Sequence, residues 1–237
     1  MTTSVLEVSD LSKSYRRVSA LSDVSFTVQA GECVGLLGPN GAGKTSLLSC
    51  LVGARMPSRG RVRVMGADPA EIGAAGHHVA YVFDPPGLSA DFTAVDCLRW
   101  EAKAQGLPPS VVDEAAERFG IAAYAKRRVG RLSTGQRQRV ALAAALIGDP
   151  EVLILDEPHN GLDIEAGRWL RDLLDDRTAR GRTTILSSHQ LDELRRIVER
   201  VVVINQTLRY DGPVPARTEE SLEAWYLTAI GREAQPR

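Results

Sequence analysis

One eight-residue stretch constrains the fold of this chain more than any other. Residues 38–45 read Gly-Pro-Asn-Gly-Ala-Gly-Lys-Thr and fit the pattern G-x-x-x-x-G-K-[ST]. The apolar segment 33–37 before it predicts a short buried strand, and residues 45–52 after it predict a helix. Strand, glycine-rich loop and helix form the context in which this pattern binds phosphate. A chance match in a glycine-rich turn is the alternative, and the pattern is too specific to favour it.

Each residue type in this phosphate loop has a chemical reason. Glycines allow positive φ and leave room for oxygen atoms to approach the backbone. The N–H groups of the loop and of the helix N-terminus then point at anionic phosphate. Lys44 supplies a charge for the β- and γ-phosphates, and Thr45 supplies a hydroxyl for Mg²⁺. The predicted nucleotide contacts are Gly38, Pro39, Asn40, Gly41, Ala42, Gly43, Lys44, Thr45 and Ser46.

The composition bounds the class of protein. A chain of 237 residues can form one large domain, or a domain with a subdomain. The net charge of -1 gives no electrostatic reason to expect a nucleic-acid partner. The three cysteines lack metal-ligand spacing, which suits a reducing cytosol. We expect no signal peptide and no membrane span, so work at a membrane would need another chain to hold this one there.

The order of periodic segments predicts an α/β fold. Strands are expected at 5–8, 22–29, 33–37, 61–65, 79–83, 152–155, 183–187, 201–205 and 207–210. Helices are expected at 45–52, 94–105, 110–119, 134–147, 163–179 and 190–199. We therefore predict a P-loop core with a parallel sheet flanked by helices, an N-terminal antiparallel β subdomain and a helical subdomain inserted at about 85–150. This single domain would cover 1–215, followed by a short helix and tail at 216–237.

Two carboxylates follow the apolar segment 152–155, at Asp156 and Glu157. In open α/β sheets, ligands bind at the carboxyl ends of the strands. Asp156 is predicted to hold Mg²⁺, and Glu157 to polarise the water that attacks the γ-phosphate. Ordinary acidic residues in a strand-end turn are the alternative, which the phosphate loop upstream disfavours.

A third segment begins at Leu132. Ser133 is a predicted helix N-cap, and Gln136 is its capping-box partner three residues on. The N-terminus of this helix would form a second anion site. Taken alone, the segment indicates no more than a capped helix. Its expected apolar face consists of Val140, Leu142, Ala143 and Leu146.

Taken together in this order, the motifs resemble the nucleotide-binding subunits of ATP-binding-cassette (ABC) transporters, over residues 6–212. Walker A corresponds to 38–45 and Walker B to 152–157. Ser187-Ser188-His189 resembles the switch histidine of the family, and Tyr15 lies where the family places an aromatic side chain that stacks on adenine. The signature corresponds to Leu132, Ser133, Thr134, Gly135 and Gln136, with Thr134 where Gly is usual. The D-loop corresponds to Asn160, Gly161, Leu162 and Asp163.

The resemblance implies an ATPase that uses ATP and Mg²⁺, with Glu157 and His189 as catalytic residues. The signature would face the ATP of a second subunit, and because this chain carries both halves of the composite site, a homodimer is feasible. ATP hydrolysis would open the two-subunit arrangement, and separate membrane permease subunits would convert that opening into transport. The chain would then lie in the cytoplasm, on the inner face of the cell membrane.

The single cassette and the run 157–163 resemble exporters of drugs, antibiotics or other small molecules. A soluble ABC ATPase of an assembly or nucleic-acid-processing machine is the alternative function. A neighbouring gene for a membrane permease would discriminate between the two. At single residues, simpler structural roles also stay open: His189 as a structural histidine, and Tyr15 as a core residue.

One position departs from the family pattern. The strand at 79–83 usually ends in Gln, which reaches Mg²⁺ and touches the membrane partner, and here it is followed by Asp84. A carboxylate is a good Mg²⁺ ligand, but Asp is shorter than Gln by one methylene. We expect Asp84 to act on Mg²⁺ through a bridging water and to mark the permease contact. A turn residue before Pro85-Pro86-Gly87 is the alternative.

Overall fold

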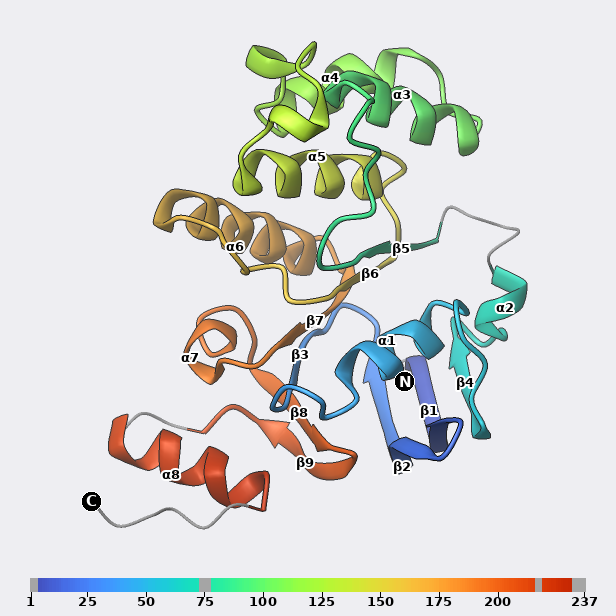
Figure 1. Cartoon of the computed structure of the whole chain (residues 1–237), viewed down its shortest axis with the longest axis vertical. Coiled ribbons are helices and arrows are strands. Elements are labelled where there is room, and N and C mark those ends of the chain that lie inside the picture. The colour runs from blue at the N-terminus through green and yellow to red at the C-terminus, as the bar shows by residue number, and fades with distance from the viewer. Residues whose placement is uncertain (1–3, 73–77, 216–218, 232–237) are drawn as a thin grey trace.

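Two β-sheets organise the computed structural model, which describes residues 4–72, 78–215 and 219–231 (Figure 1). The larger sheet has the strand order β5-β6-β7-β3-β8-β9 and is parallel except for β9. Its strands are β3 (Cys33–Leu37), β5 (Val79–Val82), β6 (Val152–Leu155), β7 (Thr183–Ser188), β8 (Arg200–Asn205) and β9 (Thr207–Pro213). The smaller, antiparallel sheet has the order β2-β1-β4, with β1 (Ser4–Tyr15), β2 (Val18–Gln29) and β4 (Arg59–Val64). The predicted α/β class and its antiparallel subdomain are confirmed.

Side chains of the larger sheet alternate between two hydrophobic cores, because successive residues of a strand point to opposite faces. On β6, Leu153 and Leu155 belong to one core, whereas Val152 and Ile154 belong to the other. The first core packs against helices, and the second against the antiparallel sheet and helix α1 (Lys44–Leu51). Both faces are therefore covered, which explains why β6 is apolar throughout.

The helical subdomain lies between β5 and β6 in the chain and forms the top of the molecule in Figure 1. Capping boxes begin two of its helices: Thr93 pairs with Asp96, and Ser133 pairs with Gln136. The predicted helices of this insert are confirmed to within about one residue at each end. Its elements are α3 (Ala94–Ala104), α4 (Ser110–Arg118), η1 (Ala122–Tyr124), η2 (Val129–Arg131) and α5 (Thr134–Leu146).

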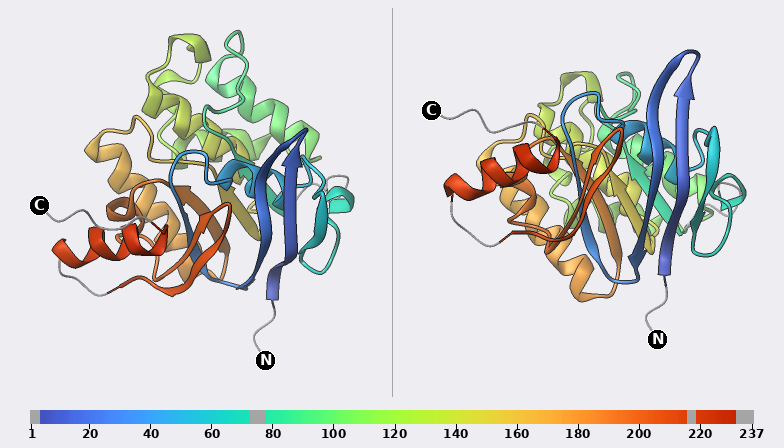
Figure 2. Two further views of the ribbon diagram at one scale, coloured as in Figure 1. Left: turned by 60° about the horizontal axis from the view of Figure 1, so that its bottom comes forward. Right: turned by 90° about the horizontal axis from the view of Figure 1, so that it is seen from below.

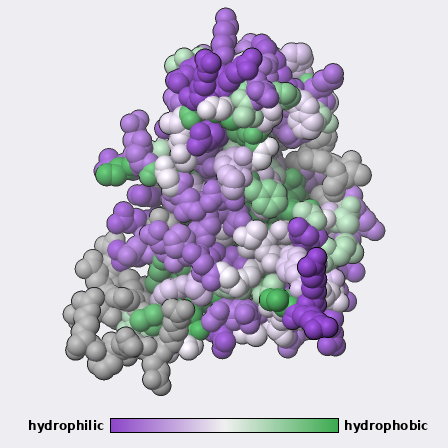
Figure 3. All heavy atoms as spheres, viewed as in Figure 1, coloured by the Kyte–Doolittle hydropathy of each residue, from purple (hydrophilic) through white to green (hydrophobic). Residues whose placement is uncertain are grey.

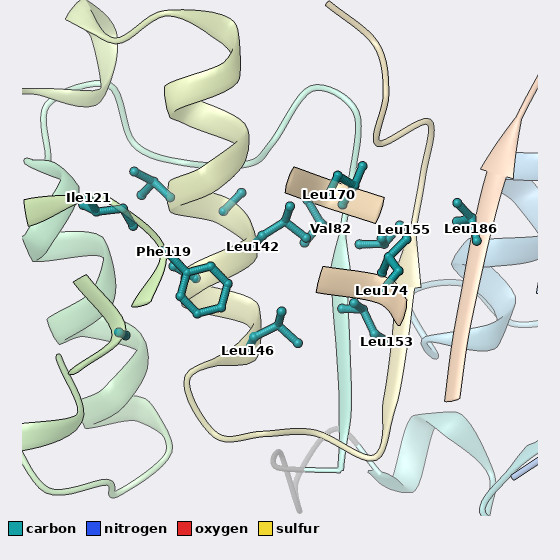
Figure 4. Packing of buried hydrophobic residues seen from close by; sticks show 14 of the residues in the cluster. Val82, Phe119, Ile121, Leu142, Leu146, Leu153, Leu155, Leu170, Leu174 and Leu186 are labelled. Atoms are coloured by element: carbon teal, nitrogen blue, oxygen red, sulfur yellow. The ribbon is translucent and has the colours of Figure 1, made fainter. Parts of the chain in front are cut away.

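Helix α5 joins this subdomain to the sheet. Leu142 and Leu146 lie on the side of α5 that faces α6 (Ile164–Ala179) and the sheet (Figure 4). Leu142 and its neighbour Leu170 on α6 are both 0% exposed. The predicted apolar face of α5 is thus the seam between the helical subdomain and the P-loop core.

Two predicted elements have different lengths in the structure. The N-terminal hairpin reaches Tyr15 and Val18, far beyond the expected strands, and Arg16 takes a positive φ of 54° in its turn. Helix α7 covers only Leu191–Leu194, so the prediction of a helix at 190–199 was wrong at its C-terminal end. The chain must leave the helix there because Arg200 pairs with Val34 in the sheet. Ile197 and Val198, which lie between the helix and β8, are β-branched and favour helix less.

The remaining helices are short and lie at the edges of the molecule (Figure 2). They are α2 (Pro69–Ile72) and α8 (Glu219–Ala229), the latter being the helix expected in the tail, of which 216–218 and 232–237 lie outside the described residues. The side-chain amide of Asn205 donates to the carbonyl of Ile230 at 2.9 Å and so ties the end of this segment to the sheet. Hydrophilic residues dominate the face seen in Figure 3. Among the described helices, none is long and apolar enough to cross a bilayer.

Shortening the Leu142 side chain tests the seam between subdomain and core. Leu142→Ala leaves a cavity between α5 and α6, and we expect it to lower the free energy of unfolding by about 2–5 kcal/mol. Urea titration followed by circular dichroism measures this. Val18→Ala is the control, because Val18 is 69% exposed and its truncation should cost about 0.5 kcal/mol or less. Equal effects of the two changes would contradict the assignment of Leu142 to the core.

Candidate nucleotide-binding site

A cleft of about 470 Å³ opens at the carboxyl ends of the parallel strands. It gathers residues from the phosphate loop, from the ends of β1, β5 and β6, and from the segment after β7. Strand ends far apart in the sequence therefore meet at one edge of the sheet, where ligands of such folds bind. Its lining consists of Tyr15, Ala20, Pro39, Asn40, Gly41, Ala42, Gly43, Lys44, Thr45, Ser46, Asp84, Asp156, Glu157, Asn160 and His189.

The glycines of the phosphate loop serve two different purposes. Gly43 has a φ of 99°, and a Cβ there would lie 2.5 Å from the carbonyl of Ala20. A Cβ at Gly38 would lie 2.4 Å from the carbonyl of Ile204. These two glycines let the loop pack closely on the sheets beneath it. Gly41, with a φ of 81°, instead has nothing within 4 Å of the position of a Cβ, so the backbone is open to an approaching group.

The carboxylate of Asp156 joins the phosphate loop to the sheet. Its Oδ2 accepts a hydrogen bond from Thr45 Oγ1 at 2.8 Å, and its Oδ1 accepts one from Ser187 Oγ at 2.6 Å. The same Ser187 hydroxyl accepts a hydrogen bond from the backbone N–H of Glu157 at 2.9 Å. Burial, together with the charge of Asp156, raises the pKa of Tyr81, so its hydroxyl stays protonated near this carboxylate.

Glu157 lies between two cationic or polar partners inside the cleft. Lys44 Nζ is 3.1 Å from Glu157 Oε1, with side chains only 7% and 14% exposed, and Lys44 also donates to the carbonyl of Gly38 at 2.8 Å. His189 Nδ1 lies 2.9 Å from Glu157 Oε2. Glu157 adopts a φ of 46°, a left-handed conformation that is strained for a residue with a side chain. Strain of this kind is concentrated at functional sites.

The residues of the cleft fit a nucleotide and its magnesium ion. Open backbone at Gly41, the N-terminus of α1 and the Lys44 ammonium suit a polyphosphate. Thr45 and Asp156 supply the hard oxygen donors that Mg²⁺ prefers. Within the described residues, no group of three or more His, Cys, Asp or Glu side chains could hold a metal by itself. Magnesium usually keeps several waters and binds through one or two carboxylates together with substrate phosphates, an arrangement that Thr45 and Asp156 would allow.

Two further predicted residues reach the same cleft. Asp84 lines it, and its Oδ2 accepts a hydrogen bond from Asn160 Nδ2 at 2.7 Å. Tyr15 lines it from the end of β1 and is 37% exposed, with Lys13 Nζ 5.2 Å from the centre of its ring. The exposure favours a ring that a ligand can reach over a ring packed in the core.

The signature and residues 161–163 of the D-loop lie outside the cleft, whereas Asn160 lines it. Leu132 is buried, while Ser133 caps α5, accepting from the backbone N–H of Gln136 at 3.2 Å. In the D-loop, Asp163 caps α6 by accepting from the N–H of Ala166 at 2.8 Å. Thr134, Gly135, Gly161 and Leu162 lie at the contact between these two helix starts. One chain thus brings together Walker A, Walker B and His189, but not its own signature.

Two residues that the sequence analysis named only as parts of motifs have roles in the site that it did not predict. Ser187 orients both Asp156 and Glu157, and Asn160 holds Asp84. For Ser187 the signal was a polar residue at the end of an apolar strand predicted to lie in the same sheet. Asn160 gave no comparable signal, since its partner is distant in the sequence.

The fold and the site define a P-loop nucleotide-binding protein, and comparison with known proteins identifies the family. The family model described as ABC transporter matches residues 21–160. The chain is 36% identical over 224 residues to the SkfA peptide export ATP-binding protein SkfE of Bacillus subtilis, with 92% of each chain covered. It is 34% identical over 236 residues to the Nod factor export ATP-binding protein I of Rhizobium leguminosarum bv. viciae, with 97% of this chain and 76% of that protein covered.

A solved structure of an ATP binding subunit of an ABC transporter superposes with a TM-score of 0.84 at 27% identity, covering 94% of this chain and 99% of that one. The chain belongs to the ABC transporter family. The resemblance of its motifs is thereby confirmed, and so is the predicted fold.

Removing the Lys44 ammonium tests the phosphate loop. Lys44→Ala loses a charge that would contact phosphate, so we expect ATP affinity to fall about ten- to a hundredfold, the range for hydrogen bonds to charged groups. Titration with a fluorescent ATP analogue measures the affinity. Lys126→Ala removes an exposed lysine from the helical subdomain and should leave binding intact. Unchanged affinity in Lys44→Ala would contradict the role of the loop.

Proposed function

We propose that this chain is the ATP-hydrolysing subunit of an ABC exporter and energises a separate membrane permease. The observation that carries the proposal is the convergence of Lys44, Glu157 and His189 in the cleft that also contains Thr45 and Asp156. Residues 1–215 then form one ABC ATPase domain, and 216–237 form its C-terminal helix and tail. The two relatives are named for the export of a peptide and of Nod factors, and these names support export as the direction of transport.

In this proposal each residue of the cleft has one role in hydrolysis. The phosphate loop, from Gly38 to Ser46, binds the phosphates, with Lys44 at the β- and γ-phosphates and Tyr15 against the adenine. Glu157 accepts a proton from the attacking water, and His189 orients Glu157 through the contact to Oε2. Thr45 and Asp156, with Asp84 acting through water, would hold magnesium, which would supply positive charge that offsets the phosphate charge.

The location of the signature supports an arrangement of two subunits. The N-terminus of α5 presents N–H groups and the positive end of the helix dipole, yet lies outside the cleft of its own chain. In a pair of chains related by a two-fold axis, the N-terminus of α5 in each chain would lie against the nucleotide bound in the cleft of the other. We therefore propose a homodimer that encloses two ATP molecules and is bound to permease subunits at the inner face of the membrane.

Glu157→Gln tests the hydrolytic role. The amide keeps the shape of the side chain but is a far weaker base, so kcat should fall at least about a hundredfold while ATP binding persists. Phosphate release and binding of a fluorescent ATP analogue measure the two quantities. Wild-type turnover in this variant would remove Glu157 from its role.

Transport is the decisive measurement for the exporter assignment. The chain is reconstituted with a candidate permease, in vesicles whose ATP-binding side faces outward. Uptake of small molecules into the vesicles should require ATP and should be absent with Glu157→Gln. Movement in the opposite direction would overturn export, and the absence of any stimulation by the permease would overturn the coupling.

Gly135→Asp tests the two-subunit arrangement. A Cβ at 135 would lie 3.8 Å from Ala166 and 3.9 Å from Leu162, which is ordinary contact, so the fold tolerates a side chain there. The new carboxylate would face the partner's γ-phosphate and repel it, so we expect ATP-driven dimerisation to be lost while the monomer still binds ATP.

Size-exclusion chromatography with ATP, in the Glu157→Gln background, measures the dimer. Gly135→Ala is the matched control, because it adds the same Cβ without the charge and should still dimerise. A dimer of unchanged stability in Gly135→Asp would show that the signature does not face a nucleotide.

A further inference from the structure

Asn160 connects two loops that leave the sheet at neighbouring strands. Strands β5 and β6 are parallel neighbours, with Val82 paired to Leu155. Asp84 follows β5 and begins the connection to the helical subdomain, while Asn160 follows β6 and begins the D-loop. Their side chains meet in a 2.7 Å hydrogen bond from Asn160 Nδ2 to Asp84 Oδ2 at the rim of the nucleotide cleft.

The next residue of the D-loop lies close to the start of the signature helix of the same chain, where a side chain would be crowded. Gly161 has a φ of 69°, and a Cβ there would lie 3.0 Å from Thr134 Cγ2. Leu162 Cδ2 lies within 3.9 Å of the Cβ position at Gly135. Figure 1 shows α6, which follows the D-loop, directly beneath α5, which follows the signature. The D-loop is therefore held between Asp84 on one side and the signature on the other.

We propose that Asn160 is a positioning residue whose hydrogen bond to Asp84 links the nucleotide cleft to the signature segment. The proposal rests on the proposed function, because it concerns hydrolysis and the two-subunit arrangement. The bond holds one oxygen of Asp84 and leaves Oδ1 for the cleft. It also ties the loop at Asp84 to the residue before Gly161, whose backbone lies so close to Thr134 that a displacement would be passed to the signature.

The test first breaks the hydrogen bond between Asn160 and Asp84 and then restores it with donor and acceptor exchanged. Asn160→Asp sets two carboxylates at hydrogen-bonding distance, so we expect kcat for ATP to fall about tenfold or more through repulsion of like charges. The KM for ATP should change little, because the phosphate loop is untouched. Adding Asp84→Asn restores a hydrogen bond with donor and acceptor exchanged, so the double variant should match Asp84→Asn alone.

A matched control removes a different charge from the same loop. The side chain of Asp91 is 92% exposed, and Asp91→Asn in the Asn160→Asp chain should not restore activity. ATP-driven dimerisation in the Glu157→Gln background gives a second readout that needs no turnover. Asn160→Asp should weaken this dimer, and Asp84→Asn should restore it.

The outcomes separate the two proposals. Normal kcat and normal dimerisation in Asn160→Asp would overturn the role of Asn160 and leave the proposed function intact. Recovery with Asp91→Asn as complete as with Asp84→Asn would also overturn it, since the effect would then be one of net charge. A wild-type chain that neither hydrolyses ATP nor dimerises with it would overturn the proposed function and this inference together.

Discussion

The carboxylate of Asp156 is the constraint on which the site depends. One oxygen accepts from Thr45, which lies at the start of α1, and the other accepts from Ser187, at the end of β7. Because both oxygens are used, the phosphate loop, β6 and β7 are fixed relative to one another at the edge where the cleft opens. The Ser187 hydroxyl then turns Glu157 by accepting its N–H. A buried carboxylate needs hydrogen-bond partners, and the same bonds that build the site supply them.

The two cores explain how this edge can be rigid while the helical subdomain stays a separate unit. Alternate residues of β6 pack on opposite faces, so each strand end is anchored from both sides. The subdomain contacts the core through α5, which packs on α6 and the sheet around Leu142, and through the end of α4, where Phe119 meets Trp169 of α6. An element packed on one side can shift as a body more readily than a strand buried on both faces. The signature stands at the start of α5, the helix that carries the contact between the subdomain and the core.

Most of the fold followed from local pattern, because buried parallel strands are apolar and capped helices carry their own start signals. Continuous apolar runs predicted β3 and β6, and the Ser133–Gln136 pair predicted the start of α5. The full hairpin of β1 and β2 was missed because its distal residues are polar and their pairing is irregular. The end of α7 was missed because the pairing of Arg200 with Val34 is long-range. The bond between Asp84 and Asn160 was missed for the same reason, since spacing in the sequence carries no signal for a contact between two loops.

The arrangement of Lys44 gives the site a built-in order of events under the proposed function. Lys44 contacts Glu157 and the carbonyl of Gly38, all within the loop and strand end that would receive phosphate. The Lys44 ammonium cannot pair fully with Glu157 and with a γ-phosphate at the same time, because the two anions compete for one positive charge. Under the proposed function, a bound phosphate would compete with Glu157 for Lys44, while His189 would still contact that carboxylate. Under the proposed function, this competition would link the proton acceptor to the presence of the group on which it acts.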